Sequence, residues 1–396
     1  MQIYVVKEND TIDKIGEAFR VSPFLLAWAN QIEPPYRLAV GQALFIPDEV
    51  GNSPESVGQP ESMGPSRREI TLGGYAYPWI EQSILEEITP FLTEISVFSY
   101  GFTEEGELVP PQEPGERRIL EMAALQNVVP ALVLTPLGPD GHFNNHLVTA
   151  AVQDMGVQQR LIRAVWAAVQ EKGYRVVNVD FEYVLAEDRQ AFADFVRRLR
   201  ILLNLYGIRV TVALAPKTSD SQPGLLYEGM DYAALGEAAN GVFLMTYEWG
   251  YTYGVNMPVA PIDQVRRVAE YALTRIPREK IILGIPNYGY DWPLPYVRGT
   301  TKAQSIGYTE AIRLAVDHGV PIHYDETAQS PWFRYWQYGI QHEVWFEDIR
   351  SLKAKFDLMD ELGLPGAGYW QLMRLFRAGW LMADSRYKIR KFPKTY

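Results

Sequence analysis

The chain has 396 residues, 47% of them hydrophobic and 13% aromatic, so it can bury a large core and is too long for one small domain. Its 37 Lys and Arg residues are outnumbered by 48 Asp and Glu, and the net charge of -11 argues against nucleic acid as a partner. The chain contains no cysteine, which excludes disulfides, thiolate metal sites and cysteine nucleophiles.

The beginning of the sequence carries neither a basic stretch nor a hydrophobic run of the kind found in secretory signals. We therefore expect no classical signal peptide. No uninterrupted hydrophobic run approaches the roughly 18 residues that a membrane-spanning helix needs, so we also expect no membrane insertion.

Residues 1–48 are predicted to form a small α+β domain. A strand pattern at Ile3–Val6 is followed by Asp10 and Thr11, either of which can cap the helix that comes next. A second helix begins at Pro23, and residues 41–47 return as a closing strand. This order predicts a βααβ unit with both helices on one face of a two-stranded sheet.

Residues 49–68 are rich in Gly, Ser, Pro and Glu and show no hydrophobic period. Such a composition is typical of a flexible linker. We therefore expect the small domain at 1–48 to be joined by this linker to a large domain at 69–396.

The large domain alternates short hydrophobic runs with longer amphipathic stretches. The runs predict strands at Ile70–Tyr77, Ile95–Phe102, Val129–Thr135, Val176–Glu182, Arg209–Pro216, Val242–Glu248, Ile281–Tyr288 and Ala367–Gln371. The amphipathic stretches include helices expected at Gln158–Lys172, Asp188–Tyr206, Asp263–Thr274 and Ile349–Leu362. This alternation predicts an α/β fold, a parallel (β/α)8 TIM barrel.

The spacing between the last two predicted strands is much longer than the others, which indicates an insertion after strand seven. The insertion is rich in aromatic residues at 332–338, and we expect it to form a wall beside the barrel mouth. Other aromatic residues that follow strand ends are equally consistent with sugar stacking and with loop packing: Tyr75, Tyr77, Trp249, Tyr251, Tyr288 and Trp292.

Asn178, Asp180 and Glu182 alternate along one predicted strand and therefore lie on one face of it. Glu182 ends the strand, where barrels carry their catalytic groups. The charge of Asp180 is expected to raise the pKa of Glu182, so that Glu182 can donate a proton to a glycosidic oxygen. No second carboxylate stands out as a nucleophile, which favours attack by the substrate's own 2-acetamido oxygen. A buried, hydrogen-bonded carboxylate pair is the alternative interpretation.

Four short motifs in order resemble those of the family-18 glycoside hydrolases. Val177–Glu182 resembles the end of the catalytic strand pattern D-x-x-D-x-D-x-E, and Met245–Glu248 resembles M-x-Y-D. Gly368–Trp370 resembles the tryptophan motif of strand eight, and Ser99–Gly101 resembles S-x-G of strand two. The resemblance covers residues 69–390.

The resemblance implies a role for each matching residue. Glu182 is the general acid/base, Asp180 positions the acetamido group and Tyr247 hydrogen-bonds its oxygen, while Trp370 forms an apolar floor under the reacting sugar. The further residues expected to bind substrate are Asn178, Met245, Glu248 and Tyr100.

The sequence departs from the family pattern in three places. Arg175 stands where the first Asp is expected, Asn178 stands for the second, and Glu248 replaces the Asp of M-x-Y-D. We expect Arg175 to face solvent at the bottom of the barrel and Asn178 to support Asp180.

The small domain resembles a LysM repeat, a module that binds N-acetylglucosamine-containing glycans such as peptidoglycan and chitin. The resemblance lies in Tyr4–Ile12, in Asn30 and in the closing segment Leu38–Pro47. It implies a groove in which the glycan contacts Asp10, Thr11, Ile12 and Ile32. A small packing domain without a ligand is the alternative.

One LysM repeat joined to this barrel resembles the spore-cortex N-acetylglucosaminidases of endospore-forming bacteria. The resemblance implies a monomer that cleaves β-1,4 bonds after N-acetylglucosamine in peptidoglycan, with no metal and no organic cofactor. It also implies a location at the spore coat or cortex surface, after synthesis in the mother cell. A chitinase and a non-catalytic peptidoglycan-binding coat protein remain as alternatives.

Overall fold

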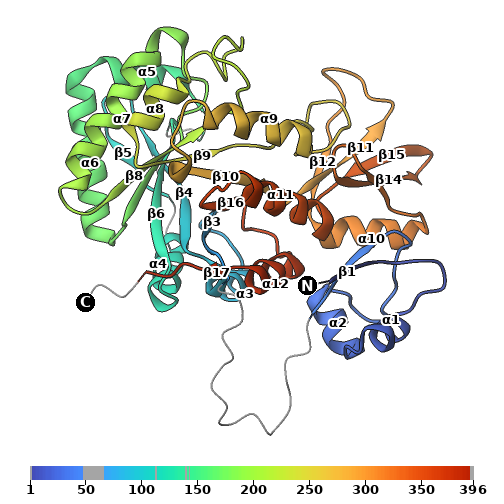
Figure 1. Cartoon of the computed structure of the whole chain (residues 1–396). Helices are drawn as coiled ribbons and strands as arrows, with labels where there is room; N and C mark the ends of the chain where they lie inside the picture. Colours follow the sequence, from blue (N-terminus) through green and yellow to red (C-terminus); the bar gives the residue numbers. More distant parts are fainter. Residues whose placement is uncertain (1, 48–66, 112–113, 139–140, 142, 393–396) are drawn as a thin grey trace, which may run out of the picture.

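The computed structural model describes residues 2–47, 67–111, 114–138, 141 and 143–392 (Figure 1). Except for its last two residues, the segment predicted to be a linker lies outside the described residues.

The N-terminal domain has the expected strand–helix–helix–strand order. Its elements are β1 (Gln2–Val5), α1 (Ile12–Phe19), α2 (Pro23–Ala29) and β2 (Ala43–Ile46). The two strands pair antiparallel. Thr11 caps α1, since its Oγ1 accepts a hydrogen bond of 3.3 Å from the backbone N–H of Lys14. Ile12, Ile15 and Leu26 fill a small core between the helices and the sheet.

Eight parallel strands form a closed barrel, as the sequence predicts. They are β3 (Glu69–Ala76), β4 (Glu94–Phe102), β6 (Val129–Leu134), β7 (Val176–Val179), β8 (Arg209–Leu214), β9 (Gly241–Leu244), β10 (Ile281–Pro286) and β16 (Gly366–Trp370). Each strand pairs with its neighbour in this order, and β16 and β4 both pair with β3, which closes the barrel. Two short strands extend the sheet outside the barrel: β5 (Leu108–Val109) and β17 (Lys388–Ile389).

Helices surround the barrel (Figure 1). The α-helices are α3 (Gln82–Ile88), α4 (Gly115–Leu125), α5 (Asn145–Gln153), α6 (Met155–Lys172), α7 (Arg189–Asn204), α8 (Tyr232–Ala238), α9 (Ile262–Leu273), α11 (Ile349–Glu361) and α12 (Arg377–Arg386). Among the described residues they are accompanied by the 3-10 turns η1 (Thr89–Phe91), η2 (Ala186–Asp188) and η3 (Arg278–Lys280). Their apolar faces and the outward residues of the strands form one continuous hydrophobic core.

The insertion after the seventh barrel strand is a separate antiparallel sheet with one helix. Its elements are β11 (Gly289–Leu294), β12 (Gln304–Ile306), α10 (Tyr308–His318), β13 (His323–Asp325), β14 (Ser330–Gln337) and β15 (Ile340–Trp345). Phe333 and Tyr335 are buried within this insertion, whereas Trp336 and Tyr338 are exposed. Strand alternation thus directs these side chains either into the small sheet's own core or into solvent.

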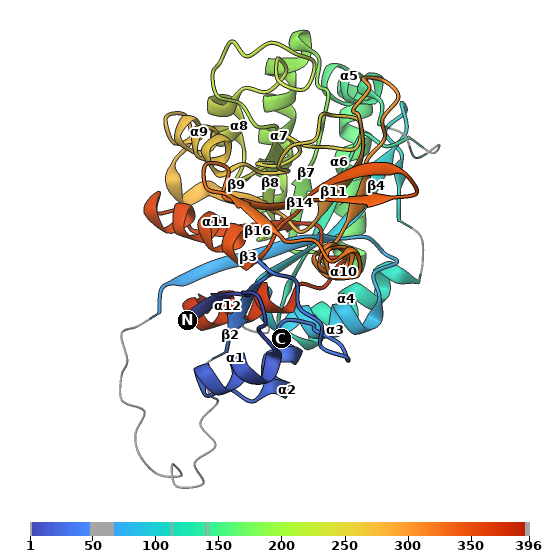
Figure 2. The same cartoon turned by 90° about the vertical axis from the view of Figure 1, so that its right-hand side faces the viewer.

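The N-terminal domain packs directly against the large domain, beside α12 (Figure 2). The backbone N–H of Ile322 donates to the carbonyl of Val40 at 2.8 Å. A Cβ on Gly41 would lie 1.9 Å from the carbonyl oxygen of Ile322, so this junction requires a glycine. The Arg377 guanidinium lies 4.8 Å from the ring centre of Trp28.

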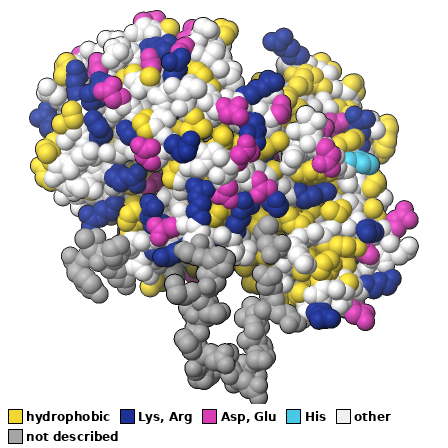
Figure 3. Space-filling view, viewed as in Figure 1, with side chains coloured by type: hydrophobic (Ala, Val, Ile, Leu, Met, Phe, Trp, Pro, Cys, Tyr) yellow, Lys and Arg dark blue, Asp and Glu magenta, His cyan; other side chains and the backbone are white. Residues whose placement is uncertain are grey.

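No helix among the described residues is long and apolar enough to cross a membrane. On the face shown in Figure 3, basic and acidic side chains are interspersed over both domains.

Candidate active site

Asp180 and Glu182 come directly after β7, at the carboxyl end of the barrel strands. Phe181, between them, points the other way and packs against Phe192 and Phe195 of α7, with ring centres 5.5 Å apart in each pair. The alternation predicted for a strand therefore continues beyond β7, and both carboxyl groups face the barrel mouth.

A pocket of about 510 Å³ at this mouth brings together six of the eight site residues predicted in the large domain. Those that line it are Asp180, Glu182, Met245, Tyr247, Glu248 and Trp370. The pocket has six further lining residues, Tyr75, Tyr183, Pro216, Leu226, Tyr227 and Tyr251. Of these, Tyr75 and Tyr251 are among the aromatic residues that the sequence places near strand ends. Tyr183, Leu226 and Tyr227 lie in loops whose course the sequence does not indicate, whereas Pro216 ends the strand predicted at Arg209–Pro216.

The two carboxyl groups have raised pKa values. Burial, and after it the charge of Glu248, raises the pKa of Glu182 to about 7. Burial and the charge of Glu182 raise the pKa of Asp180 well above its usual range. The direction expected for Glu182 is confirmed. Burial is the larger cause, the charge of Glu248 adds to it, and the repulsion between Asp180 and Glu182 is seen in the raised pKa of Asp180.

One oxygen of Asp180 lacks a hydrogen-bond partner. Its Oδ1 is buried and meets no donor among the described residues. An unpaired buried carboxylate oxygen is costly, and nearly all such groups in proteins are satisfied. The site therefore holds an acceptor for which a ligand can supply the donor.

Asn178 lies deeper in the barrel, below the pocket. Its Nδ2 donates to Thr211 Oγ1 at 2.9 Å, and its Oδ1 accepts from the Tyr75 hydroxyl at 3.1 Å. Asn178 does not line the catalytic pocket, so the structure places it as a support rather than as a substrate contact. Arg175 is exposed just before β7, as expected.

Tyr247 is buried near the start of the loop that follows β9. Burial and the nearby carboxylates raise the pKa of its hydroxyl well above the usual range, so the group is a hydrogen-bond donor. A Cβ on Gly284 of β10 would lie 3.0 Å from the Tyr247 ring and 2.1 Å from the Leu244 carbonyl. A glycine in β10 therefore makes room for this tyrosine.

Glu248 stands at the rim of the pocket and is held by two tyrosines of the loop and strand after β10. Its Oε1 accepts hydrogen bonds from the hydroxyls of Tyr288 and Tyr290, the latter at 2.9 Å. Its packed surroundings raise the pKa of Glu248, and the two phenol hydrogen bonds partly offset that effect. Of the aromatic residues considered above, Tyr288 thus orients an acid, whereas Trp292 is buried in the insertion.

Trp370 ends β16 and lies among other aromatic rings. Its ring centre is 4.9 Å from that of Phe98 and 5.4 Å from that of Tyr75, both in edge-on contact. This packing fixes the indole at the pocket, where its remaining surface offers an apolar platform.

Tyr100 is not part of the pocket, contrary to the expectation that it binds substrate. It is 1% exposed, and its hydroxyl donates to Glu116 of α4. The pairing of β4 with β6 is irregular between Val97 and Tyr100. This irregularity breaks the alternation, so Tyr100 faces the helices although Phe98 faces the barrel interior.

The predicted glycan contacts of the N-terminal domain occupy different environments. Asp10 accepts hydrogen bonds from the Tyr4 hydroxyl at 2.7 Å and from the Lys7 backbone at 2.8 Å, which hold its loop. Thr11 is exposed and Ile32 is partly buried. Ile12 is 4% exposed and packs in the domain core, so its side chain is structural.

No group of three or more His, Asp or Glu side chains in the described part of the chain is arranged to hold a metal ion.

Comparison with known families gives two matches. The pattern of Glycosyl hydrolases family 18 matches residues 76–374, and that of the LysM domain matches residues 4–47.

Several characterised proteins resemble the whole chain. The cortical fragment-lytic enzyme of Bacillus subtilis (strain 168) is 38% identical over 100% of both chains, and that of Bacillus anthracis is 34% identical over 99% of both. The crystal structure of the Bacillus megaterium QM B1551 spore cortex-lytic enzyme SleL superposes with a TM-score of 0.91 over 99% of each chain, at 33% identity. A chitinase from Chromobacterium violaceum, at 24% identity and a TM-score of 0.73, shares the fold.

Proposed function

The chain belongs to the glycosyl hydrolases family 18 and carries a LysM domain, and from this we propose that it is a retaining β-N-acetylglucosaminidase of spore-cortex peptidoglycan. The observation that carries the proposal is the pocket in which Glu182, with a pKa near 7, lies beside Asp180 with its unpaired Oδ1. The names of the full-length relatives support the choice of substrate.

In the first step, the protonated Glu182 donates its proton to the glycosidic oxygen as the bond from that oxygen to the anomeric carbon breaks. The carbonyl oxygen of the sugar's 2-acetamido group attacks the same carbon from the opposite face and forms a cyclic oxazolinium ion. No carboxylate of the enzyme is then needed as a nucleophile.

Asp180 and Tyr247 position the acetamido group for this attack. The N–H of the acetamido group donates to the unpaired Oδ1 of Asp180, which satisfies that buried acceptor. The Tyr247 hydroxyl donates to the acetamido oxygen. Both contacts fix the near-attack geometry and favour the charge that develops on the ring.

In the second step, Glu182 acts as a base. Its carboxylate takes a proton from a water molecule, whose oxygen attacks the anomeric carbon and opens the oxazolinium ring. Two inversions give retention of the β configuration. Trp370 supports the apolar face of the sugar throughout, and Met245 and Glu248 line the same position.

The LysM domain binds N-acetylglucosamine-containing glycan and holds the barrel on its polymeric substrate, with Thr11, Ile32 and the Asp10 loop at the glycan. We place the protein at the coat or cortex surface of the spore, as a monomer made in the mother cell. The relatives named as spore cortex-lytic enzymes support this location.

The test is a mass analysis of the reducing ends that wild type and Glu182→Gln release from spore peptidoglycan. We expect new N-acetylglucosamine reducing ends from wild type, and a rate lower by about a thousandfold or more from the variant, because the general acid is lost. Glu187→Gln, which alters an exposed glutamate on η2, is the matched control. Release of N-acetylmuramic acid ends, or of none by either protein, contradicts the proposal. Faster turnover of chito-oligosaccharides than of cortex fragments favours a chitinase instead.

A further inference from the structure

Lys217 is buried in the loop that follows β8, and the mechanism above gives it no role. Its side chain is fully buried. Its Nζ donates to three backbone carbonyl oxygens, at 3.3 Å to Asp220, at 3.1 Å to Tyr227 and at 2.8 Å to Met230. An ammonium group has three donors, so these bonds use all of them. A buried charge is costly, and here the carbonyl groups compensate it.

The three carbonyl groups belong to one loop, residues 217–231, which connects β8 to α8 through a series of turns. Asp220 lies in the first half of this loop, whereas Tyr227 and Met230 lie in the second half. The ammonium group of Lys217 therefore joins the two halves. An ammonium group points its donors in three directions, whereas a guanidinium group is planar, which favours lysine over arginine at this position.

The loop held by Lys217 forms one wall of the catalytic pocket. Leu226 and Tyr227 line that pocket. Gly229 lies against the chain that follows β7, because a Cβ on this glycine would be 2.2 Å from the carbonyl oxygen of Val184. The position of the loop is thus defined relative to the strand that carries the two catalytic carboxyl groups.

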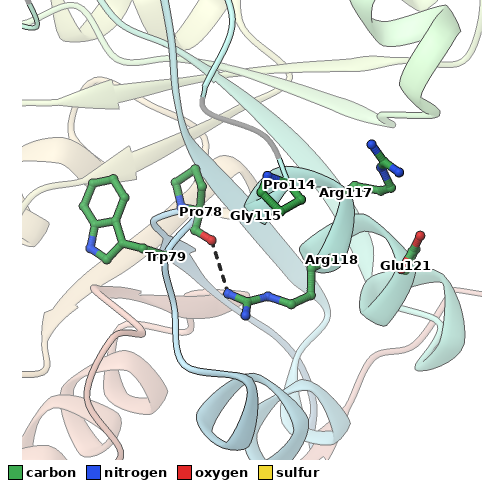
Figure 4. A pocket seen from close by; sticks show the side chains of 7 residues that line it. All are labelled: Pro78, Trp79, Pro114, Gly115, Arg117, Arg118 and Glu121. Atoms are coloured by element: carbon green, nitrogen blue, oxygen red, sulfur yellow. Dashed lines mark hydrogen bonds between the residues drawn. The ribbon is translucent and has the colours of Figure 1, made fainter.

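Tyr227 also lines a second pocket, of about 460 Å³, that adjoins the catalytic pocket. The two pockets share Pro216, Tyr227, Tyr247 and Glu248. By contrast, the pocket of about 500 Å³ at the start of α4, which Figure 4 shows, shares no lining residue with the catalytic pocket. A sugar chain that extends from the reacting position into the adjoining pocket therefore passes Tyr227.

We propose that Lys217 is a positioning residue for substrate binding: its buried ammonium group holds residues 217–231 in the shape that brings Tyr227 against the sugar next to the reacting N-acetylglucosamine. The inference rests on the proposed function, because it takes a sugar chain as the ligand of the pocket. Tyr227 suits such a ligand, since its ring offers an apolar face and its hydroxyl offers a hydrogen bond. A wall that is fixed before binding loses little entropy when the sugar docks.

Steady-state kinetics on a soluble cortex tetrasaccharide test the role of Lys217. Lys217→Met nearly keeps the length of the side chain but removes its three donors. We expect its KM to rise about tenfold, with kcat within about threefold of wild type. Tyr227→Ala should raise KM by a similar factor. The double variant should be no worse than either single variant, because Lys217 acts through Tyr227 and the two effects are not additive.

Two matched controls separate binding from stability. Lys280→Met removes a lysine whose Nζ also donates to backbone carbonyls, of Gly236 at 2.8 Å and of Ala239 at 2.9 Å. Lys280 lies just before β10, at the end of the barrel opposite the pocket. Its loss should lower the midpoint of urea unfolding, as the loss of Lys217 does, but leave KM unchanged. Tyr206→Ala removes an exposed tyrosine and should also leave KM unchanged.

An unchanged KM in Lys217→Met or in Tyr227→Ala overturns the proposal. Increases in KM that multiply in the double variant also overturn it, because Lys217 would then act independently of Tyr227. If Lys217→Met does not fold, Lys217→Gln takes its place with the same expected rise in KM, since it keeps an amide donor on a shorter side chain.

Binding measured without turnover distinguishes failure of this proposal from failure of the proposed function. The dissociation constant of the tetrasaccharide is determined for Glu182→Gln alone and for Glu182→Gln combined with Lys217→Met or with Tyr227→Ala. The LysM domain is the same in all three proteins, so a difference reports on the pocket. Weaker complexes of the combined variants support the proposal even if wild type does not hydrolyse the tetrasaccharide, in which case the proposed function fails alone. Equal dissociation constants overturn the role of Lys217.

Discussion

Glu182 and Asp180 are two acids in one buried environment, and each disfavours the ionisation of the other. Burial is the main cause of both raised pKa values, and Glu248 adds to that of Glu182. Sites of this kind titrate as a group, so the proton held near neutral pH belongs to the cluster. A carboxyl group that keeps its proton near pH 7 can serve as an acid in the first step and as a base in the second.

The pH dependence of catalysis follows from this environment. We expect kcat/KM to fall as pH rises through about 7, where Glu182 loses the proton that it must donate. Removing the charge of Glu248 by Glu248→Gln lowers the pKa of Glu182, so the falling limb should move to lower pH. Initial rates on a soluble cortex fragment from pH 5 to 9 measure the falling limb of wild type and that of Glu248→Gln, with Glu187→Gln as control. A limb that stays in place in Glu248→Gln would show that this charge does not act on Glu182.

The same raised pKa affects stability. The folded protein binds the Glu182 proton more tightly than the unfolded chain does, so the stabilisation is complete below the unfolded pKa of 4.5 and is lost as pH rises through about 7. Glu182→Gln cannot lose a proton. At pH 8 it should therefore be more stable than wild type by on the order of 3 kcal/mol, with a smaller difference at pH 4.5. Urea unfolding at both pH values measures this, and a difference independent of pH would contradict it.

At the scale of elements, the irregular pairing of β4 decides which side chains reach the barrel interior. Phe98 contacts Trp370, while Tyr100, only two residues later, bonds Glu116 behind the sheet. Glu116 is fully buried and also accepts from Tyr174 at 2.6 Å and from Lys172. Tyr100 thus helps to satisfy a buried acid that anchors α4 to the barrel.

Tyr100→Phe should therefore affect the stability of the protein, whereas Tyr247→Phe should affect its activity. Tyr100→Phe removes a donor to a buried carboxylate and should lower the free energy of unfolding by about 1–2 kcal/mol, with kcat/KM unchanged. In the proposed mechanism Tyr247 donates to the acetamido oxygen, so Tyr247→Phe should lower kcat about a hundredfold. Urea unfolding and steady-state kinetics on the two variants decide. If Tyr100→Phe lost activity but kept its full stability, Tyr100 would have to contribute to the active site.

At the scale of the whole molecule, the contact between the two domains sets where the glycan-binding module lies. The Arg377 side chain bonds Glu87 on the barrel side and the carbonyl oxygen of Trp28 on the other, the latter at 2.7 Å. Gln31 also bonds the backbone of Leu375 and Arg377. Because these contacts fix the LysM domain beside α12, one glycan strand can meet both domains only along a defined path.

Arg377→Ala should loosen this contact without touching the active site. We expect faster amide hydrogen exchange in α2 and β2 and unchanged kcat/KM on a soluble fragment, because the pocket lies elsewhere. Turnover of intact peptidoglycan should fall several-fold as the fixed path is lost. Arg266→Ala, which breaks an exposed pair with Glu361, is the control. Unchanged exchange in α2 would show that Arg377 does not hold the domain.

Much of the fold of this protein can be predicted from local sequence patterns. Hydrophobic residues that recur every two residues predict the eight barrel strands, and those that recur about every 3.6 residues predict the main helices. The alternation also predicts that Asp180 and Glu182 lie on one face of their strand. These features depend only on neighbouring residues, and so does the capping of α1 by Thr11. The short motifs at 177–182, 245–248 and 368–370 indicate the family, and each of them is also a run of neighbouring residues.

Other features depend on residues that are distant in sequence, and only the tertiary structure decided them. The irregular pairing of β4 turned Tyr100 away, and the packing of the small domain turned Ile12 into its core. The charge of Glu248 adds to the effect of burial on the pKa of Glu182, and the position of Glu248 depends on Tyr288 and Tyr290. The docking of the LysM domain depends on contacts such as that between Val40 and Ile322. Strand register, burial and domain contacts result from long-range packing, which a local pattern does not encode.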